Sequence, residues 1–303
     1  MISKRLKDIL VFVKFITFVL YLVVSSFAYA ENIKTYKIIV PFSAGGASDV
    51  LARFIEPELN QRLAKHQINL IVVNKVGAGG SIGLDTVIKS NELTFGFFSP
   101  FFAINKNIRN DYYYDFNSVE FLSFAGYNKM VILSGTYTNI NQLKELCSNN
   151  KSISFGSSGI GSTSHLASYL FAKKYLKCKD ILSVPYKGVS SVYPDLKAGR
   201  IDFMADFAIN VDGFIETKYL NYIEEIKESD FASWHILVSN KNQNKDSEIV
   251  KMEFESLKRN VQFTNRLQEQ FNIYKFSETN DVNWLKNQFV NYKKLIDSMP
   301  ASN

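Results

Sequence analysis

Cysteine and histidine are scarce in this sequence, which limits the chemistry that it can support. The 303 residues include only Cys147 and Cys178, and only His66, His165 and His235. Neither a CxxC pair nor a cluster of histidines and cysteines occurs, although such clusters are the usual sequence sign of a metal site. We therefore expect no metal site and no cofactor.

A strong excess of one charge is also missing. The whole chain has a formal charge of +6, but its first thirty residues carry four Lys/Arg and one Asp, so the remainder carries only +3. No run of Lys and Arg with interleaved aromatic residues stands out. A nucleic-acid surface normally shows such a basic patch, so we expect no nucleic-acid partner.

The N-terminus contains an apolar run that is short for a membrane-spanning helix. A basic start at residues 4–14 precedes the run Phe15–Val24, and Ala28–Ala30 supplies a small-x-small cleavage pattern. Even extended to about 16 residues, the run is shorter than the roughly 20 that cross a bilayer. We predict a cleaved signal peptide over residues 1–30 and export of the mature chain, with an uncleaved membrane anchor as the alternative.

The rest of the chain alternates short apolar runs with amphipathic helical stretches. Its length suits two domains, and 46% hydrophobic with 21% charged residues is the composition of a folded globular protein. Repeated β-α-β alternation predicts an α/β fold in which each domain is a mainly parallel sheet flanked by helices. We expect domain 1 to combine residues 31–127 with 229–303, and domain 2 to contain residues 128–228.

The expected elements follow from the spacing of apolar residues. The expected strands are Tyr36–Val40, Asn69–Asn74, Leu93–Phe98, Met130–Ser134, Ser152–Phe155, Ile181–Pro185, Ile201–Asp206 and His235–Ser239. The expected helices are one that starts near Ser48, then Ile82–Lys89, Ile140–Cys147, Ser164–Leu176, Ser191–Ala198, Lys245–Gln270 with a break, and Val282–Met299.

The two cysteines allow two interpretations. Each lies at the end of an expected helix just before an expected strand, so Cys147 and Cys178 could meet at one edge of a sheet. Export to an oxidising compartment favours a disulfide, which would add about 3 to 4 kcal/mol of stability. Two free buried thiols are the alternative, because the sequence does not give the distance between them.

Two of the expected strand-to-helix turns are built from small residues and hydroxyls. They are Ser43–Ser48 in the first half of the chain and Ser157–Thr163 in the second. Ligands of parallel α/β sheets sit beyond the carboxyl ends of the strands, where the first N–H groups of the next helix have no internal acceptor. Two such turns that face each other predict a clamp for a small carboxylate. Similar turns also begin many helices that bind nothing.

The two turns belong to a series of motifs that resembles a known family. The chain is similar to the tripartite tricarboxylate transporter substrate-binding proteins, the Bug family, over roughly residues 36–206. The motifs that carry the resemblance are Ile38–Arg53, Val72–Gly83, Phe155–Ala167, Val184–Gly188 and Ala198–Asp206.

The resemblance implies a periplasmic binding protein of the type II (Venus-flytrap) fold. Such a protein captures a small carboxylate, which includes di- and tricarboxylates, amino acids and related organic acids, and delivers it to the membrane subunits of a tripartite transporter. We expect it to act as a monomer. The ligand-binding residues that the resemblance implies are Phe42, Ser43, Ala44, Gly45, Gly46, Ser48, Asp49, Ser99, Pro100, Ser157, Gly159, Gly161, Ser162, Thr163 and Asp206. Asp49 also fits a purely structural role at the start of its helix.

Two departures from the family pattern affect these expectations. The residues after the third expected strand are Pro100-Phe101-Phe102, where the family commonly has small polar residues, so the pocket could gain an apolar wall. The segment between Asp206 and Trp234 is shorter than the family pattern. A shorter hinge could alter closure of the clamp.

Competing functions have less support. Gly156–Ile160 does not match the GxSxG nucleophile elbow, and Gly77–Ile82 lacks the third glycine of a dinucleotide fingerprint. No P-loop is present. We therefore expect a binding protein and not an enzyme. A sensor that presents the same closed clamp to a membrane receptor remains the alternative to transport.

Cleavage after Ala30 would give a mature protein whose first residue is Glu31. We expect N-terminal sequencing of the protein recovered from a periplasmic fraction to find Glu31 as its first residue. An intact N-terminus retained in the membrane fraction would instead support the anchor.

Overall fold

The computed structural model describes residues 33–99, 118–149, 151–211, 219–226, 234–271 and 274–275, together with the single residues 12, 14, 16 and 17. Met1–Lys34 and Thr35–Asn303 form separate units, and the fold below is that of the second unit. The expected cleavage site, Pro100 and the expected helix Val282–Met299 lie outside the described residues. Within the described residues, no helix combines the length and the apolar character that crossing a membrane requires.

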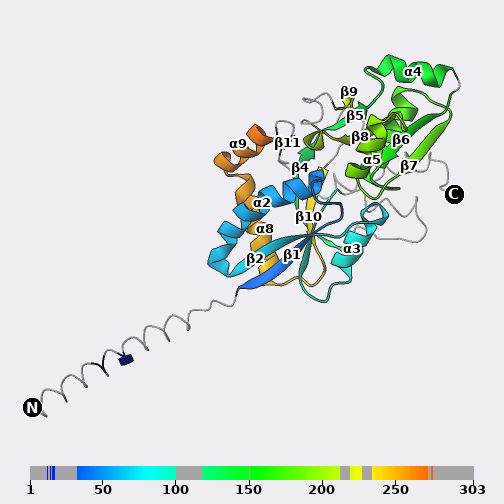
Figure 1. Cartoon of the computed structure of the whole chain (residues 1–303). Coiled ribbons are helices and arrows are strands. Elements are labelled where there is room, and N and C mark those ends of the chain that lie inside the picture. The colour runs from blue at the N-terminus through cyan, green and yellow to red at the C-terminus, as the bar shows by residue number, and fades with distance from the viewer. Residues whose placement is uncertain are drawn as a thin grey trace, which may run out of the picture. The chain divides into compact units, whose positions relative to one another are not determined.

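The first sheet contains the strands from both ends of the unit (Figure 1). Its order is β11-β4-β10-β3-β1-β2. The strands are β1 (Lys34–Val40), β2 (Ile68–Asn74), β3 (Thr94–Phe98), β4 (Glu120–Asn128), β10 (Trp234–Ser239) and β11 (Tyr274–Lys275). The helices that follow these strands are α2 (Ala47–Leu63), α3 (Ser81–Ile88), α8 (Lys245–Lys258) and α9 (Val261–Gln270).

The side chains of β1 alternate between the two faces of this sheet, and each face has its own hydrophobic core. Ile38 and Val40 of β1 pack with residues of α2, α8 and α9, whereas Ile39 packs with Leu84 of α3. Successive side chains of a strand point to opposite faces, so a strand that is apolar on both faces needs helices on both sides. The sequence of β1 therefore requires the layered arrangement that the structure has.

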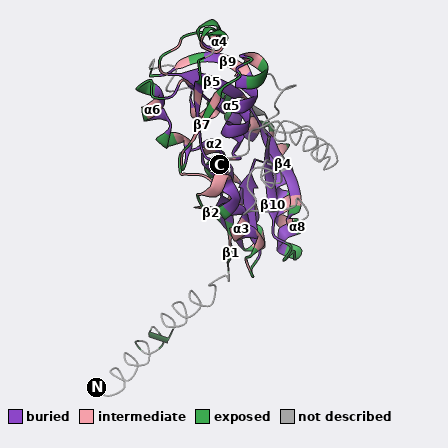
Figure 2. Ribbon diagram, turned by 90° about the vertical axis from the view of Figure 1, so that its right-hand side faces the viewer, coloured by how far each residue is buried: buried purple, intermediate pink, exposed green. Residues whose placement is uncertain are grey.

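The second sheet has the order β7-β6-β8-β5-β9. Its strands are β5 (Met130–Ser134), β6 (Ile153–Ser157), β7 (Ile181–Pro185), β8 (Phe203–Phe207) and β9 (Asn221–Ile226). Its helices are α4 (Ile140–Ser148), α5 (Thr163–Leu170), which continues as a π-helical turn (Phe171–Tyr175), and α6 (Tyr193–Lys197). Every residue of α5 is buried. Figure 2 shows the buried residues of α5 in the same colour as those of β4 and β10 in the first sheet.

The chain passes from the first sheet to the second through one residue. β4 ends at Asn128 and β5 begins at Met130, so Lys129 alone connects them. The carbonyl oxygen of Lys129 accepts a hydrogen bond from the N–H of Ala208, at 2.9 Å, just after β8. The return connection, residues 227–233, lies outside the described residues. The assignment of residues 128–228 to a separate domain remains our proposal.

The expected two-sheet α/β architecture is confirmed, but the sheets are mixed and not mainly parallel. β1 pairs with β3 in parallel, and β6 pairs with β7 and β8 in parallel, as expected for β-α-β units. β10 runs antiparallel to β3 and β4, and β5 runs antiparallel to β8 and β9. β5 and β10 each follow a passage of the chain from one sheet to the other. Among the described residues, no helix returns the chain to the starting end of a sheet at these passages, and parallel pairing requires such a return.

A disulfide joins Cys147, at the end of α4, to Cys178, just before β7. Their Cα atoms are 4.8 Å apart, and 31 residues separate them in sequence. Of the two interpretations that the sequence left open, the structure has the bonded one. Closing a loop of this length reduces the entropy of the unfolded chain and contributes about 3 to 4 kcal/mol.

Loss of this bond should lower the stability of the protein. We expect Cys147→Ala combined with Cys178→Ala to reduce the free energy of unfolding by about 3 to 4 kcal/mol, measured by urea denaturation without reductant. Dithiothreitol should destabilise the wild type and leave the double variant unchanged. Equal midpoints for the oxidised wild type and the double variant would show that the bond contributes little.

Candidate functional site

The first glycine-rich turn connects β1 to α2. The N–H of Gly46 donates to the carbonyl oxygen of Ser43 at 3.1 Å, and Gly45 has a φ of +80°, which favours glycine. Gly46 is the N-cap of α2, so the helix starts one residue before the expected Ser48. A glycine cap offers no side-chain acceptor to the first N–H groups of the helix.

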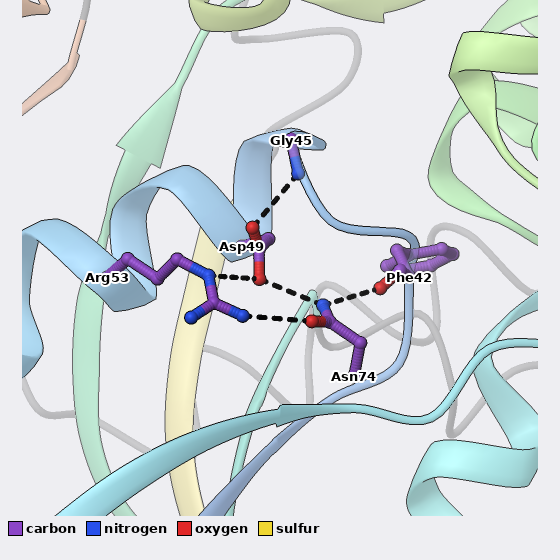
Figure 3. Close-up of polar contacts among 5 residues, drawn as sticks. All are labelled: Phe42, Gly45, Asp49, Arg53 and Asn74. Atoms are coloured by element: carbon purple, nitrogen blue, oxygen red, sulfur yellow. Dashed lines mark hydrogen bonds and ion pairs between the residues drawn. The ribbon is translucent and has the colours of Figure 1, made fainter.

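The carboxylate of Asp49 reaches back from α2 to hold this turn (Figure 3). It accepts hydrogen bonds from the N–H of Gly45, from Arg53 Nε and from Asn74 Nδ2, each at 2.9 Å. Asn74 Nδ2 also donates to the carbonyl oxygen of Phe42. Burial by itself would raise the pKa of Asp49, but these donors together outweigh it and lower the pKa. Asp49 is therefore ionised at neutral pH and fixes the path of the turn.

The second turn connects β6 to α5 and is held by its own hydroxyls. Ser162 is the N-cap of α5, and its Oγ accepts from the N–H of His165 at 3.3 Å. Ser164 Oγ lies 2.9 Å from Ser158 Oγ and 3.1 Å from Ser162 Oγ. The N–H of Gly161 donates to His165 Nδ1, and burial lowers the pKa of His165 to about 4, so the ring is neutral and can accept. His165 therefore packs and supports the turn.

Residues from both turns line one cavity with an empty volume of about 370 Å³. The start of α2 contributes one part of the wall and the start of α5 another, so the structure brings the two predicted turns together. The lining residues are Phe42, Ser43, Gly46, Ala47, Ser48, Ser158, Thr163, Ser164, Val189, Asp206, Phe207 and Asn210.

A second cavity of about 280 Å³ adjoins the first, because Phe42 and Thr163 line both. Its lining residues are Pro41, Phe42, Gly79, Gly80, Phe98, Ser99, Gly161, Ser162 and Thr163. Ser99 is only 6% exposed, and its hydroxyl has no hydrogen-bond partner within the described part of the chain. Such a buried hydroxyl is available to a ligand.

The predicted site residues divide between the cavities and their supports. Those that line a cavity are Phe42, Ser43, Gly46, Ser48, Ser99, Gly161, Ser162, Thr163 and Asp206. Those that line neither cavity are Ala44, Gly45, Asp49, Ser157 and Gly159. Pro100 lies outside the described residues.

A third turn, Gly77–Gly80, was missing from the predicted set. Gly77, Gly79 and Gly80 all have positive φ, and a Cβ atom at Gly79 would collide with the carbonyl oxygen of Ile160. The turn before α3 therefore meets the turn before α5 backbone to backbone. The three closely spaced glycines within the second family motif could have indicated this turn from the sequence.

Asp206 at the end of β8 forms the acidic part of the first cavity. It is fully buried, and its Oδ2 accepts a 2.5 Å hydrogen bond from the hydroxyl of Tyr193. Its Oδ1 accepts from the N–H of Phe207 at 2.8 Å and from Asn210 Nδ2 at 3.0 Å. Burial raises the pKa of Asp206 to about 6, against the opposing effect of these three donors.

His235 supports the first cavity from behind. Its Nε2 lies 3.0 Å from Ser48 Oγ, and its ring stacks on Phe97 and contacts Phe207. Burial lowers the pKa of His235 to about 3, so the imidazole is neutral at physiological pH. It orients the hydroxyl of Ser48 without adding charge.

Backbone N–H groups and hydroxyls dominate the chemistry of the two cavities. Among the described residues that line them, Asp206 is the only one with a formal charge. In the described part of the chain no group of three or more His, Cys, Asp or Glu side chains is placed to hold a metal ion. The uncapped start of α2 and the start of α5, where Ser162 meets only one N–H group, lie next to hydroxyls and are suited to bind a carboxylate without a cationic side chain.

Comparison with known proteins places this geometry in context. The model of the tripartite tricarboxylate transporter family receptor matches residues 51–229. A UPF0065 protein from the tcbD-tcbE intergenic region of Pseudomonas sp. (strain P51) is 33% identical over 175 residues, which are 55% of this chain and 51% of that protein. The chain spans about half the length of the curated relatives that it matches.

Solved structures share the fold of this chain, and one of them is a periplasmic binding protein. The structure of the periplasmic binding protein BugD has a TM-score of 0.72 at 22% identity, over 87% of this chain and 95% of that chain. MatC from Rhodopseudomonas palustris with bound malate has a TM-score of 0.75 at 14% identity, over 88% of this chain and 99% of that chain. At these identities the likeness shows the fold, which is the expected type II periplasmic-binding-protein fold.

The contacts of Asp49 predict a specific loss of stability. We expect Asp49→Ala to lower the free energy of unfolding by about 1 to 3 kcal/mol at pH 7, because the variant removes hydrogen bonds to a buried charged group. A carboxylate with a lowered pKa contributes stability above its unfolded pKa, which is about 4, and loses that contribution as the pH falls further. The difference from wild type should therefore narrow at pH 3 in urea denaturation.

Asp85 provides the matched control. It forms a partly exposed i, i+4 ion pair with Lys89 at 2.8 Å on α3, in which the Asp85 side chain is 25% exposed. Asp85→Ala should cost less than about 1 kcal/mol at either pH. Equal losses for the two variants would contradict a special role for Asp49.

Proposed function

The chain belongs to the tripartite tricarboxylate transporter receptor family, and we propose that it is a periplasmic solute-binding protein that captures a small carboxylate for a transporter of this type. The observation that carries the proposal is the cavity lined by the starts of both α2 and α5. Each start points backbone N–H groups at the same space, where a carboxylate gains hydrogen bonds and the favourable end of two helix dipoles.

The residues of the site have distinct roles in this proposal. The backbone N–H groups of Ala47 and Thr163 donate to the ligand carboxylate, and the hydroxyls of Ser48 and Ser162 complete its hydrogen bonds. Asp49 acts from outside the cavity, because it holds the first turn through Gly45 and Asn74. Phe42 lines both cavities and gives the ligand an apolar contact.

The relatives support carriage of a carboxylate and not its conversion. MatC, which has the same fold, was solved with bound malate. We propose a monomer that is exported with its signal peptide removed, binds its ligand in the periplasm and presents it to the membrane subunits.

Ligand binding should be visible as thermal stabilisation. A ligand that binds only the folded state adds about 2.7 kcal/mol at a concentration of 100 times its Kd, which is several degrees of Tm for a protein of this size. We expect at least one organic acid or amino acid in a thermal-shift screen to raise the Tm. Ser162→Leu combined with Thr163→Leu should abolish that increase, because the larger side chains fill the space at the start of α5.

The control separates binding from loss of a helix cap. Ser162 caps α5, so the double variant is also less stable without ligand. Asn139 caps α4 in the same way and lines neither cavity. Asn139→Ala should lower the Tm of the free protein and keep the ligand-induced increase. The proposal fails if no carboxylate raises the Tm of the wild type, or if the double variant keeps the full increase.

A further inference from the structure

We propose that the ligand is an amino acid or another amino carboxylate, and that Asp206 and Asn210 receive its protonated amine. This inference rests on the proposed function, because it assumes that the starts of α2 and α5 hold the carboxylate of the same molecule. In this proposal the carboxylate of the ligand binds at the helix starts, and its positively charged amine binds at Asp206 and Asn210 in the first cavity.

The charge of the cavity is the first argument. Asp206 is the only charged side chain among the described lining residues of both cavities, and no Lys, Arg or His lies among them. A dicarboxylate would add two negative charges beside the ionised Asp206 without a cationic side chain to balance them. A zwitterion brings its own positive charge, so the buried carboxylate gains a partner and the total charge stays low.

The hydrogen bonds of Asn210 supply an independent argument. Asn210 Nδ2 donates to Asp206 Oδ1 at 3.0 Å, which orients the amide and leaves its oxygen and its second N–H for other partners. Asn210 Oδ1 is buried and has no hydrogen-bond partner within the described part of the chain. Asn210 lines the same cavity as Asp206. Within the described residues, the wall therefore presents a carboxylate and an acceptor without a partner side by side, which suits a donor with several N–H bonds.

The titratable groups around Asp206 do not supply a positive charge in place of a ligand. Tyr193 of α6 donates to Asp206, and burial raises the pKa of Tyr193, so its hydroxyl stays neutral. His165 of α5 and His235 of β10 are both neutral, because burial lowers the pKa of the first to about 4 and of the second to about 3. Lys129, which precedes β5, pairs with Glu225 of β9 at 3.1 Å.

The direction of the pH dependence distinguishes this proposal from dicarboxylate binding. An amine binds the ionised form of Asp206, so affinity for an amino carboxylate should fall as the pH drops through about 6, where Asp206 gains a proton. One pH unit below that pKa, the ionised fraction is about tenfold lower, and the affinity should follow it. A second carboxylate at this wall would need the protonated form, and its affinity should rise over the same range.

The experiment compares ligands that differ only in the amine. Isothermal titration calorimetry of the purified protein would use L-glutamate with glutarate, L-aspartate with succinate, and L-alanine with propionate. We expect the wild type at pH 7.5 to bind at least one amino carboxylate about tenfold or more tightly than its partner without the amine, since a hydrogen bond to a charged group contributes about that factor. Between pH 7.5 and pH 5.0 that preference should shrink by about tenfold.

Asp206→Asn is the matching variant, because it keeps the shape of the side chain and removes its charge. We expect it to bind the two members of the best pair within about twofold of each other, with no pH dependence of the preference. Asp195 is the control, since its carboxylate also accepts a hydrogen bond from a tyrosine, Tyr186, at 2.7 Å, and it lines neither cavity. Asp195→Asn should keep the preference of the wild type.

Each outcome decides one of the two proposals. A wild type that binds succinate or glutarate as tightly as the amino acid, or more tightly at pH 5.0 than at pH 7.5, overturns the role of Asp206 and leaves the carboxylate-binding function standing. If Asp206→Asn keeps the preference for the amino carboxylate, the proposed role of Asp206 is overturned as well. If Asp206→Asn does not fold, the pH dependence of the wild type gives the decision alone. Absence of binding for every carboxylate, with or without an amine, contradicts the proposed function itself.

Discussion

The site depends on one constraint, which is that the first N–H groups of a helix have no acceptor within the helix. At α2 the N-cap is a glycine, so no side chain there meets those groups. At α5 the cap is Ser162, whose hydroxyl satisfies one N–H near the first turn. The two starts line one cavity, so the unsatisfied donors of two sheets converge on the same space. A carboxylate placed there accepts hydrogen bonds from N–H groups that have no acceptor within their helices.

The surrounding side chains keep these backbone groups in position and leave the cavity open to a ligand. Asp49 binds Gly45 from outside the cavity, so a charged group determines the path of the first turn without occupying the site. His165 and His235 perform similar supporting roles as neutral rings, because burial keeps both uncharged. The acidic wall at Asp206 is the exception: its charge faces the cavity itself, and its three donors hold it in place. The cavity is therefore polarised between donor-rich helix starts and an acceptor-rich strand end.

Much of the fold could be predicted from local sequence patterns, and the parts that could not depend on distant partners. The strands Met130–Ser134 and Ile181–Pro185 were predicted with the bounds that the structure has, because each is a short apolar run that is followed by a helical pattern. β4 was missed, since it is held by antiparallel pairing with β10 more than a hundred residues later in the chain. The cavity-lining role of Asn210 was missed for a related reason: it depends on a short turn after β8 that has no marker in the sequence. The contact of Gly79 with Ile160 joins separate turns, so neither motif alone predicts it.

The single-residue connection at Lys129 has a mechanical consequence. A strand can bend between β4 and β5 but cannot lengthen there, so at this connection the two sheets can rotate relative to each other but cannot slide apart. Asp206 pairs in register with Val131, two residues beyond Lys129, so the acidic wall lies close to the pivot. In a rotation, the atoms nearest to the axis move least. The acidic wall would therefore move little in such a rotation.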